Sequence, residues 1–331
     1  MTTDLGPNAD QIDTMRHNIL NRVTPSGDSV AVPAPHRRVT SRRIGFATLG
    51  VATLAAALIA ANILVPVGAG GGATAEAAEF LDSAAAATIE TSDPVVEPGQ
   101  FLRIATNAVY GASTGEAGYD EYWLAPSTSV LYIPANRSDE WVWERRPLQP
   151  TVFFGGTEEI ALQKYQEWLR DPQMNGVRHG ASGVFSDTSS GRDYGMDEMP
   201  RGPSALRDYF YDSYTDGSAS IDEDVWVRIT DLLRTGEVPA DLRAALYRAI
   251  ALIPGVEIID DQAALDGRTG VALGRVEPAR GSTSREEIII DPTTGLIIGE
   301  RTVILARQGE IPSGTVVSSA SIETTVVNSA P

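Results

Sequence analysis

PADLRAALYRAIALIPG, residues 239–255, is the strongest helix signal in the chain. Its apolar residues recur at the spacing that places them on one helical face: Leu242, Leu246, Ile250 and Ile253. A proline opens the segment and a Pro-Gly pair closes it, as is typical of helix ends. Strand-like sequences lie before and after it, so this helix belongs to the middle of a strand, helix, strand order.

Strand patterns occupy residues 101–144 and 256–326, which are rich in β-branched and aromatic residues and are interrupted by Gly, Ser, Asn and Pro clusters. Short turns between successive strands favour antiparallel pairing. DPTTG at 291–295 is a strong hairpin signal, because proline presets the turn and glycine accepts the left-handed conformation. The order predicts one α+β domain, residues 101–331, in which helices cover the concave face of a curved antiparallel sheet.

The middle of the chain has weaker patterns. Amphipathic spacing predicts three further helices, at 158–170, 203–214 and 221–233. Residues 119–124 and 130–133 read as two separate strands. Residues 176–202 are rich in glycine and polar residues, so we expect a mobile loop there.

A long uncharged segment precedes this domain. No charged residue occurs between Arg43 and Glu76, and residues 44–67, IGFATLGVATLAAALIAANILVPV, are almost uniformly apolar. At ~1.5 Å per helical residue the segment reaches about 36 Å, which exceeds the roughly 30 Å hydrocarbon layer of a bilayer. The segment therefore predicts one transmembrane helix. Residues 68–100 follow it as an exit linker that contains a helix at 75–88.

A basic cluster before the apolar segment sets the expected orientation. It contains four arginines: Arg37, Arg38, Arg42 and Arg43. Positively charged flanks remain on the cytoplasmic side, so we expect a cytosolic arm (1–43) and an extracytoplasmic domain in a single-pass protein of the cell membrane. The alternative is a twin-arginine export signal that is cleaved after Ala75, but the apolar run exceeds the roughly 7–15 residues of such a signal.

The arm has one amphipathic helix pattern, residues 9–23. This helix either rests on the inner leaflet of the bilayer or docks a cytosolic regulatory protein. The charge also changes across the apolar segment. The arm carries six arginines and four aspartates, whereas the outer part carries 20 basic and 40 acidic residues, a net charge of −20. Such an acidic domain repels phosphates, so nucleic acid is excluded as its partner.

Few residues offer catalytic or metal chemistry. The chain has no cysteine, and His179 is the one histidine of the outer part, so thiolate catalysis is excluded and a typical zinc site is disfavoured. Three acidic clusters lack the spacing of a calcium loop and read mainly as solvated loops and helix starts: Asp120-Glu121, Asp222-Glu223-Asp224 and Asp260-Asp261. We predict no cofactor, no metal and no enzymatic activity.

Aromatic residues give the most interesting candidate site. Six of them fall on predicted strands and covering helices where a curved sheet would hold an apolar ligand: Tyr122, Tyr132, Trp141, Trp143, Tyr211 and Trp226. Trp141 and Trp143 share one face of their strand, because side chains alternate along a strand. Ordinary core packing is the competing interpretation for most of these side chains.

Several stretches together resemble an uncharacterised actinobacterial family of single-pass membrane proteins. They are the arginine cluster, PGQF at 98–101, LRAALY at 242–247 with PGV at 254–256, GRTGV at 267–271, and DPTTG at 291–295. Genes of that family often lie beside extracytoplasmic-function sigma factors, so the resemblance implies a sensing or sigma-regulating role. The element order is also similar to the half-barrel of lipoprotein carriers, a likeness of architecture that does not fix function.

Three functions therefore stay open from the sequence. The first is a membrane-anchored extracytoplasmic sensor or binding protein linked to sigma-factor regulation. The second is an exported carrier that binds a hydrophobic ligand in the concavity of the sheet. The third is an exported hydrolase that uses paired carboxylates.

Overall fold

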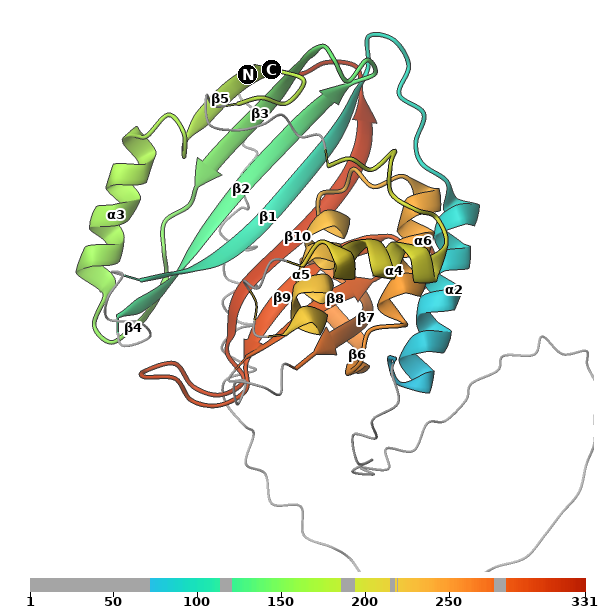
Figure 1. Ribbon diagram of the computed structural model, residues 1–331. Helices are drawn as coiled ribbons and strands as arrows, with labels where there is room; N and C mark the ends of the chain where they lie inside the picture. Colours follow the sequence, from blue (N-terminus) through green and yellow to red (C-terminus); the bar gives the residue numbers. More distant parts are fainter. Residues whose placement is uncertain (1–71, 114–120, 186–193, 215–217, 219, 277–283) are drawn as a thin grey trace, which may run out of the picture.

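The computed structural model of the protein describes residues 72–113, 121–185, 194–214, 218, 220–276 and 284–331 (Figure 1). The predicted cytosolic arm, the anchor at 44–67 and the four topology arginines lie outside these residues. Within the described ranges, no helix is both long and apolar enough to cross a membrane.

One antiparallel sheet of ten strands organises the domain, in the order β5-β3-β2-β1-β10-β9-β8-β7-β6, with β4 paired to β2. The sheet is curved and does not close, and β5 and β6 form its two edges (Figure 1). The predicted α+β class with a curved antiparallel sheet is confirmed. The strand bounds are β1 Phe101–Ser113, β2 Tyr122–Pro134, β3 Glu140–Pro147, β4 Val152–Phe154, β5 Gly176–Ala181, β6 Val256–Leu265, β7 Arg268–Arg275, β8 Ser284–Ile290, β9 Ile297–Ile304 and β10 Val316–Val327.

The first and last strands of the described chain join the two halves of the sheet. β1 pairs with β10 from Phe101 opposite Val327 to Val109 opposite Ser319. One half is the meander that β1 begins, and the other is the meander that β10 ends. The predicted DPTTG turn connects β8 to β9, and Gly295 adopts the left-handed conformation with φ 65°.

The helices divide unequally between the two halves. Their bounds are α2 Ala75–Thr91, α3 Glu158–Arg170, α4 Pro203–Asp212, α5 Ile221–Leu233 and α6 Ala240–Ile250. α2, α4, α5 and α6 form the largest core together with Leu273, Ile288 and Ile290 of the sheet, whereas α3 lies at the other end, near β3 and β4 (Figure 1). The predicted helix at 239–253 is confirmed as α6, most of which is buried.

α2 is packed into this core. Its small residues Ala77, Ala84 and Ala85 are buried with Leu81, and the helix lies against α6. The backbone N–H groups of Ala73 and Thr74 donate to the carbonyls of Ala251 and Val256 at 3.0 and 2.9 Å. Thr74 then caps the helix, since its hydroxyl accepts from the Ala77 N–H.

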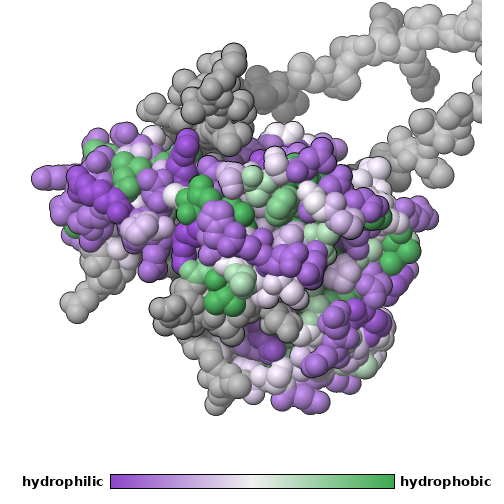
Figure 2. Space-filling view, turned by 90° about the horizontal axis from the view of Figure 1, so that it is seen from above, coloured by the Kyte–Doolittle hydropathy of each residue, from purple (hydrophilic) through white to green (hydrophobic). Residues whose placement is uncertain are grey.

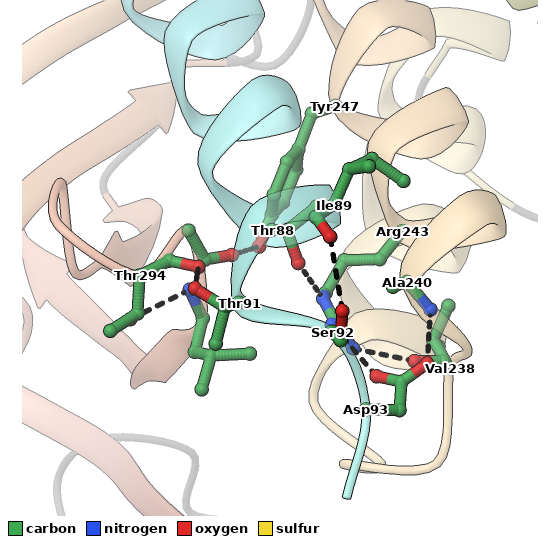
Figure 3. Close-up of polar contacts among 12 residues, drawn as sticks. Thr88, Ile89, Thr91, Ser92, Asp93, Val238, Ala240, Arg243, Tyr247 and Thr294 are labelled. Carbon is green, nitrogen blue, oxygen red and sulfur yellow. Dashed lines mark hydrogen bonds and ion pairs between the residues drawn. The ribbon is translucent and has the colours of Figure 1, made fainter.

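A polar cluster fixes the other end of α2 (Figure 3). Arg243 of α6 donates to the hydroxyl of Thr88, to the Val238 carbonyl at 2.6 Å and to the Asp93 carboxylate at 2.9 Å. The second carboxylate oxygen of Asp93 accepts from the Ala240 N–H at the start of α6. The cluster thereby provides hydrogen-bond acceptors for both the buried guanidinium of Arg243 and an N–H group at the start of α6.

Two local predictions are wrong. Of the two strands expected at 119–124 and 130–133, the parts from Tyr122 onward belong to one strand, β2, because the residues between the two ranges pair with β1, and from Ser127 also with β3. Part of the loop expected at 176–202 is strand β5, which pairs with β3 from Glu140 to Arg145. In both places, hydrogen bonds to strands that lie elsewhere in the sequence outweigh local turn signals.

Candidate functional site

One face of the sheet presents an apolar surface to α4 and α5. Ile104 of β1 lies opposite Leu131 of β2, which lies opposite Trp143 of β3. The neighbouring row pairs Thr106 with Ser129. Because residues two apart on a strand share a face, these side chains form a continuous patch across three strands.

A chamber of about 470 Å³ lies between this patch and the helices. Its lining is mixed: Ile104, Leu131, Trp143, Met199, Phe210 and Ile322 are apolar, whereas Thr106, Ser129, Arg228, Asp231, Arg234 and Thr235 are polar or charged. The surface seen from above in Figure 2 is mostly hydrophilic, and its hydrophobic residues form small separate patches.

A second chamber of about 240 Å³ lies under α5, on the β8–β10 side. Its lining is polar and charged, with Glu286, Glu300 and Ser318 from the strands. Trp226 of α5 also lines it. Three residues line both chambers: Tyr110, Asp231 and Arg234. The two chambers therefore adjoin at the C-terminal end of α5.

Charges concentrate where the chambers meet. Arg234 Nε lies 2.8 Å from Asp231 Oδ1, and Arg234 Nη1 lies 3.7 Å from Glu300 Oε1. Burial raises the pKa of Glu300 to about 7; Arg234 opposes this rise, and Asp231 and Glu286 add to it. Burial also raises the pKa of Tyr110. Glu300 is thus a carboxyl group that changes charge near neutral pH.

Capping and side-chain pairing hold α5 in place over the cleft. The Ser220 hydroxyl accepts from the Glu223 N–H at the N-terminus, where acidic residues of the first turn complement the helix dipole. Arg228 pairs with Asp224 at 3.3 Å and donates to the Phe210 carbonyl of α4 at 3.1 Å. These bonds join α4 and α5 into one roof.

The turn after α5 rests directly on the β1–β10 seam. Gly236 has φ 72°, and a Cβ there would lie 3.1 Å from Ile104 Cγ2. A side chain at this position would be strained by both the conformation and the contact. The next residue, Glu237, pairs with Arg137 of the β2–β3 turn, so the roof is also tied to the other half of the sheet.

The structure places two of the six sequence-predicted aromatics in the cleft and a third beside it. Trp143 lines the larger chamber and Trp226 lines the smaller one. Trp141 packs in the core beside the larger chamber, and its indole N–H donates to the Arg137 carbonyl at 2.9 Å.

The other three aromatics lie elsewhere. Tyr132 is buried and alternates with Leu131 and Ile133, so it lies on the opposite face of β2. Tyr122 packs near Phe154 at the far end of β2. Tyr211 of α4 donates its hydroxyl proton to Asp222 and contacts the large core. None of the three lines either chamber.

The charged residues of the cleft were missed by sequence reasoning. Arg234 follows α5, where a cation is ordinary at a helix C-terminus. Glu300 offered a faint signal, since it stands within the apolar strand sequence LIIGERTVIL at 296–305. Its nearness to Arg234 depends on the packing of α5 against β9, which local sequence does not encode.

The residues considered for catalysis do not converge on the cleft. His179 lies on edge strand β5, exposed, with its ring 3.0 Å from Glu140. Asp222 and its neighbours form the first turn of α5, and Asp260 lies on β6. Within the described ranges, no three His, Cys, Asp or Glu side chains are grouped closely enough to hold a metal ion.

Comparison with known proteins adds no assignment of function. No protein-family model matches this chain, and no curated protein matches it either. Proposals on function therefore depend on the geometry of the cleft and on the sequence itself.

Proposed function

We propose that the protein is a single-pass membrane protein whose extracytoplasmic domain senses an apolar ligand bound between the sheet and the α4–α5 roof. The observation that carries this proposal is the larger chamber, whose volume of about 470 Å³ falls within the roughly 300–1,000 Å³ typical of ligand sites. The apolar part of its lining, which includes Ile104, Leu131 and Phe210, favours contact with a hydrocarbon group. The same geometry suits a half-barrel in which helices cover the concave face.

A retained anchor fits the start of the fold better than cleavage after Ala75. Such cleavage would remove Thr74, which caps α2, and the two backbone hydrogen bonds made by Ala73 and Thr74. A helix loses about 0.5–2 kcal/mol when its cap is removed. The residues before Ala75 thus contribute to folding, which supports the anchored sensor over the released carrier.

The cytosolic arm is the part of the proposed sensor that would pass the signal to a protein inside the cell. In this proposal, the helix at 9–23 docks a cytosolic regulatory protein, and the bilayer lies between that site and the ligand chamber. The link to sigma-factor regulation follows from the family resemblance. The exported carrier uses the same chamber, so detection of an anchor and of an arm-bound protein separates the two functions.

The absence of cysteine allows a direct test with the full chain in phosphatidylcholine nanodiscs. Ser129→Cys places a thiol in the larger chamber, and Thr128→Cys places one on the opposite face of β2. The probe is N-phenyl-1-naphthylamine, a neutral apolar molecule. We expect it to slow alkylation of Cys at 129 by N-ethylmaleimide at least fivefold and to leave the rate at 128 unchanged.

Equal rates at 129 with and without the probe would exclude the chamber as a binding site. Thermal unfolding followed by circular dichroism checks that both variants fold. A second test uses Ser129→Phe, which narrows the chamber, beside Thr128→Phe as the matched control. Capture of the probe by the protein is expected to be weaker in the first variant and unchanged in the second.

A further inference from the structure

Above about pH 7, where Glu300 is ionised, the smaller chamber carries an excess of negative charge. Asp231, Glu286 and Glu300 share it with Arg234. Arg301 and Arg285 share the buried carboxylate of Glu287, at 2.6 and 2.7 Å, and Arg301 also lies 3.6 Å from Asp260, so these two cations face two carboxylates and add no net charge. A positively charged group is the natural complement of such a chamber, whereas an anion would be repelled.

A buried hydrogen-bond donor provides a second, independent observation. Trp226 is 2% exposed and lines this chamber, yet its indole N–H has no partner among the described residues. An unsatisfied buried donor costs about 1–3 kcal/mol, so native proteins usually supply an acceptor. The nitrogen atom exposes less than 1 Å², so a ligand oxygen in the chamber would satisfy this donor after a small shift of the surrounding side chains.

The two chambers together describe one elongated ligand. Tyr110, Asp231 and Arg234 line both of them, so an apolar group on one side and a polar group on the other can belong to the same molecule. The overall charge of the outer part, −20, also attracts cations toward the domain over long range.

Building on the proposed function, we propose that the cleft binds a single-chain amphiphile with a positively charged head. Its hydrocarbon chain lies in the larger chamber against Leu131 and Ile322, and its head lies beside Glu286 and Glu300. An ester or hydroxyl oxygen between head and chain accepts the hydrogen bond from Trp226. Amphiphiles with anionic heads are rejected by the same carboxylates.

Two matched probes separate head charge from chain binding. Lauroylcholine and monolaurin carry the same acyl ester, but only lauroylcholine is cationic; laurate supplies the anionic case. Two single-cysteine reporters, Ser129→Cys and Ser318→Cys, lie in the larger and the smaller chamber of the full chain in nanodiscs. Protection of each thiol from N-ethylmaleimide is titrated with each probe.

We expect lauroylcholine to protect both thiols and to bind about tenfold more tightly than monolaurin, with laurate the weakest. In the Glu286→Gln/Glu300→Gln background the preference for lauroylcholine over monolaurin should fall to about twofold or less. Monolaurin affinity should be unchanged there. Glu310→Gln, an exposed carboxylate paired with Arg307, is the control that keeps the preference.

Each contrary result has a separate meaning. Equal protection at 129 by all three probes, or tightest binding of laurate, would overturn the charged-head inference and leave the apolar site intact. Protection at 129 by lauroylcholine without protection at 318 would overturn the placement of the head. Failure of every probe, including the neutral naphthylamine, to protect 129 would overturn the proposed function itself.

Discussion

The two pairs of helices on this sheet differ in how completely they fill the space above it. Where α2 meets α6, the side chains of Leu81, Leu246 and Ile250 are fully buried. Where α4 and α5 meet the sheet, two adjoining chambers persist. The layer of helices thus has a close-packed half, α2 and α6, which supplies stability, and an open half, α4 and α5, which holds the proposed binding site.

Two arginines, Arg243 and Arg234, differ in the same way in their burial and in their polar partners. The side chain of Arg243 is 9% exposed and its bonds run to Thr88, Val238 and Asp93. The side chain of Arg234 is 39% exposed and lies between carboxylates that also line the cleft. The first arginine holds two helices together in the core, whereas the second lies at the proposed ligand site and is partly exposed to solvent.

The largest expected effect comes from a cavity in the close-packed half. Leu246→Ala removes a fully buried side chain of α6 and should lower the free energy of unfolding by about 2–5 kcal/mol. Urea unfolding measures it. The control is Arg248→Ala on the exposed face, whose ion pair with Asp82 is worth at most about 1 kcal/mol. Equal losses in the two variants would contradict the close packing of α6.

The second largest effect is the difference in the free energy of unfolding between variants of the two arginines. Arg243→Ala leaves a buried hydroxyl, a carbonyl and a carboxylate without their donor, so we expect a loss of about 3 kcal/mol. Arg234→Ala should cost less than about 1 kcal/mol, because Asp231 is exposed and Glu300, whose pKa is about 7, can take up a proton when its cation is removed. Urea unfolding of both variants measures the difference, and a reversed order would show that the open half carries the stability.

Glu300 should make stability depend on pH. Its pKa is raised from 4.5 in the unfolded chain to about 7 in the folded protein, so the folded protein keeps this proton up to a higher pH. The proton therefore stabilises the folded state fully below about pH 4.5, and this stabilisation is lost as the pH rises through about 7. Glu300→Gln should be more stable than the parent protein at pH 8, by about 1–2 kcal/mol, since loss of the attraction to Arg234 offsets part of the gain.

The measurement for Glu300 is urea unfolding at pH 5 and pH 8 for parent and variant. Glu310→Gln, on an exposed turn, should show no such change between the two pH values. A variant that follows the parent at both pH values would contradict the burial of this carboxyl group.

Removal of a helix cap should have the smallest effect on stability, and the loss should be equal for α2 and α5. Thr74 and Ser220 cap α2 and α5 through hydroxyl oxygens that accept from the Ala77 and Glu223 N–H groups. Thr74→Ala and Ser220→Ala should each lower the melting temperature by an amount equivalent to about 1 kcal/mol. Calorimetry measures both melting temperatures. If only one variant melts at a lower temperature, the two caps do not contribute equally to stability.

Several elements were predictable from the sequence because their physics is local. The spacing of Leu242, Leu246 and Ile250 marks the buried face of α6, and all three are fully buried. Proline and glycine in DPTTG mark the turn between β8 and β9. The alternation along β3 correctly places Trp141 and Trp143 on one face. The arm, the anchor and their orientation stay predictions of the sequence.

The site was less predictable, because it depends on residues far apart in the chain. Of the six aromatic candidates, Trp143 and Trp226 line the chambers, while Tyr132 fell on the other face once β2 formed a continuous strand. The meeting of Arg234 with Glu300 needs α5 to cross β9. Neither residue has a local pattern that distinguishes it from an ordinary surface charge.

The sequence by itself determined which segments become strands and helices over most of the described chain, and that the class is α+β, because backbone preference and apolar periodicity act over a few residues. Tertiary structure alone decided that β1 pairs with β10, that α2 packs against α6, and that α5 stands over two chambers. Those choices maximise burial and hydrogen bonding between segments up to about two hundred residues apart, and no local pattern records them.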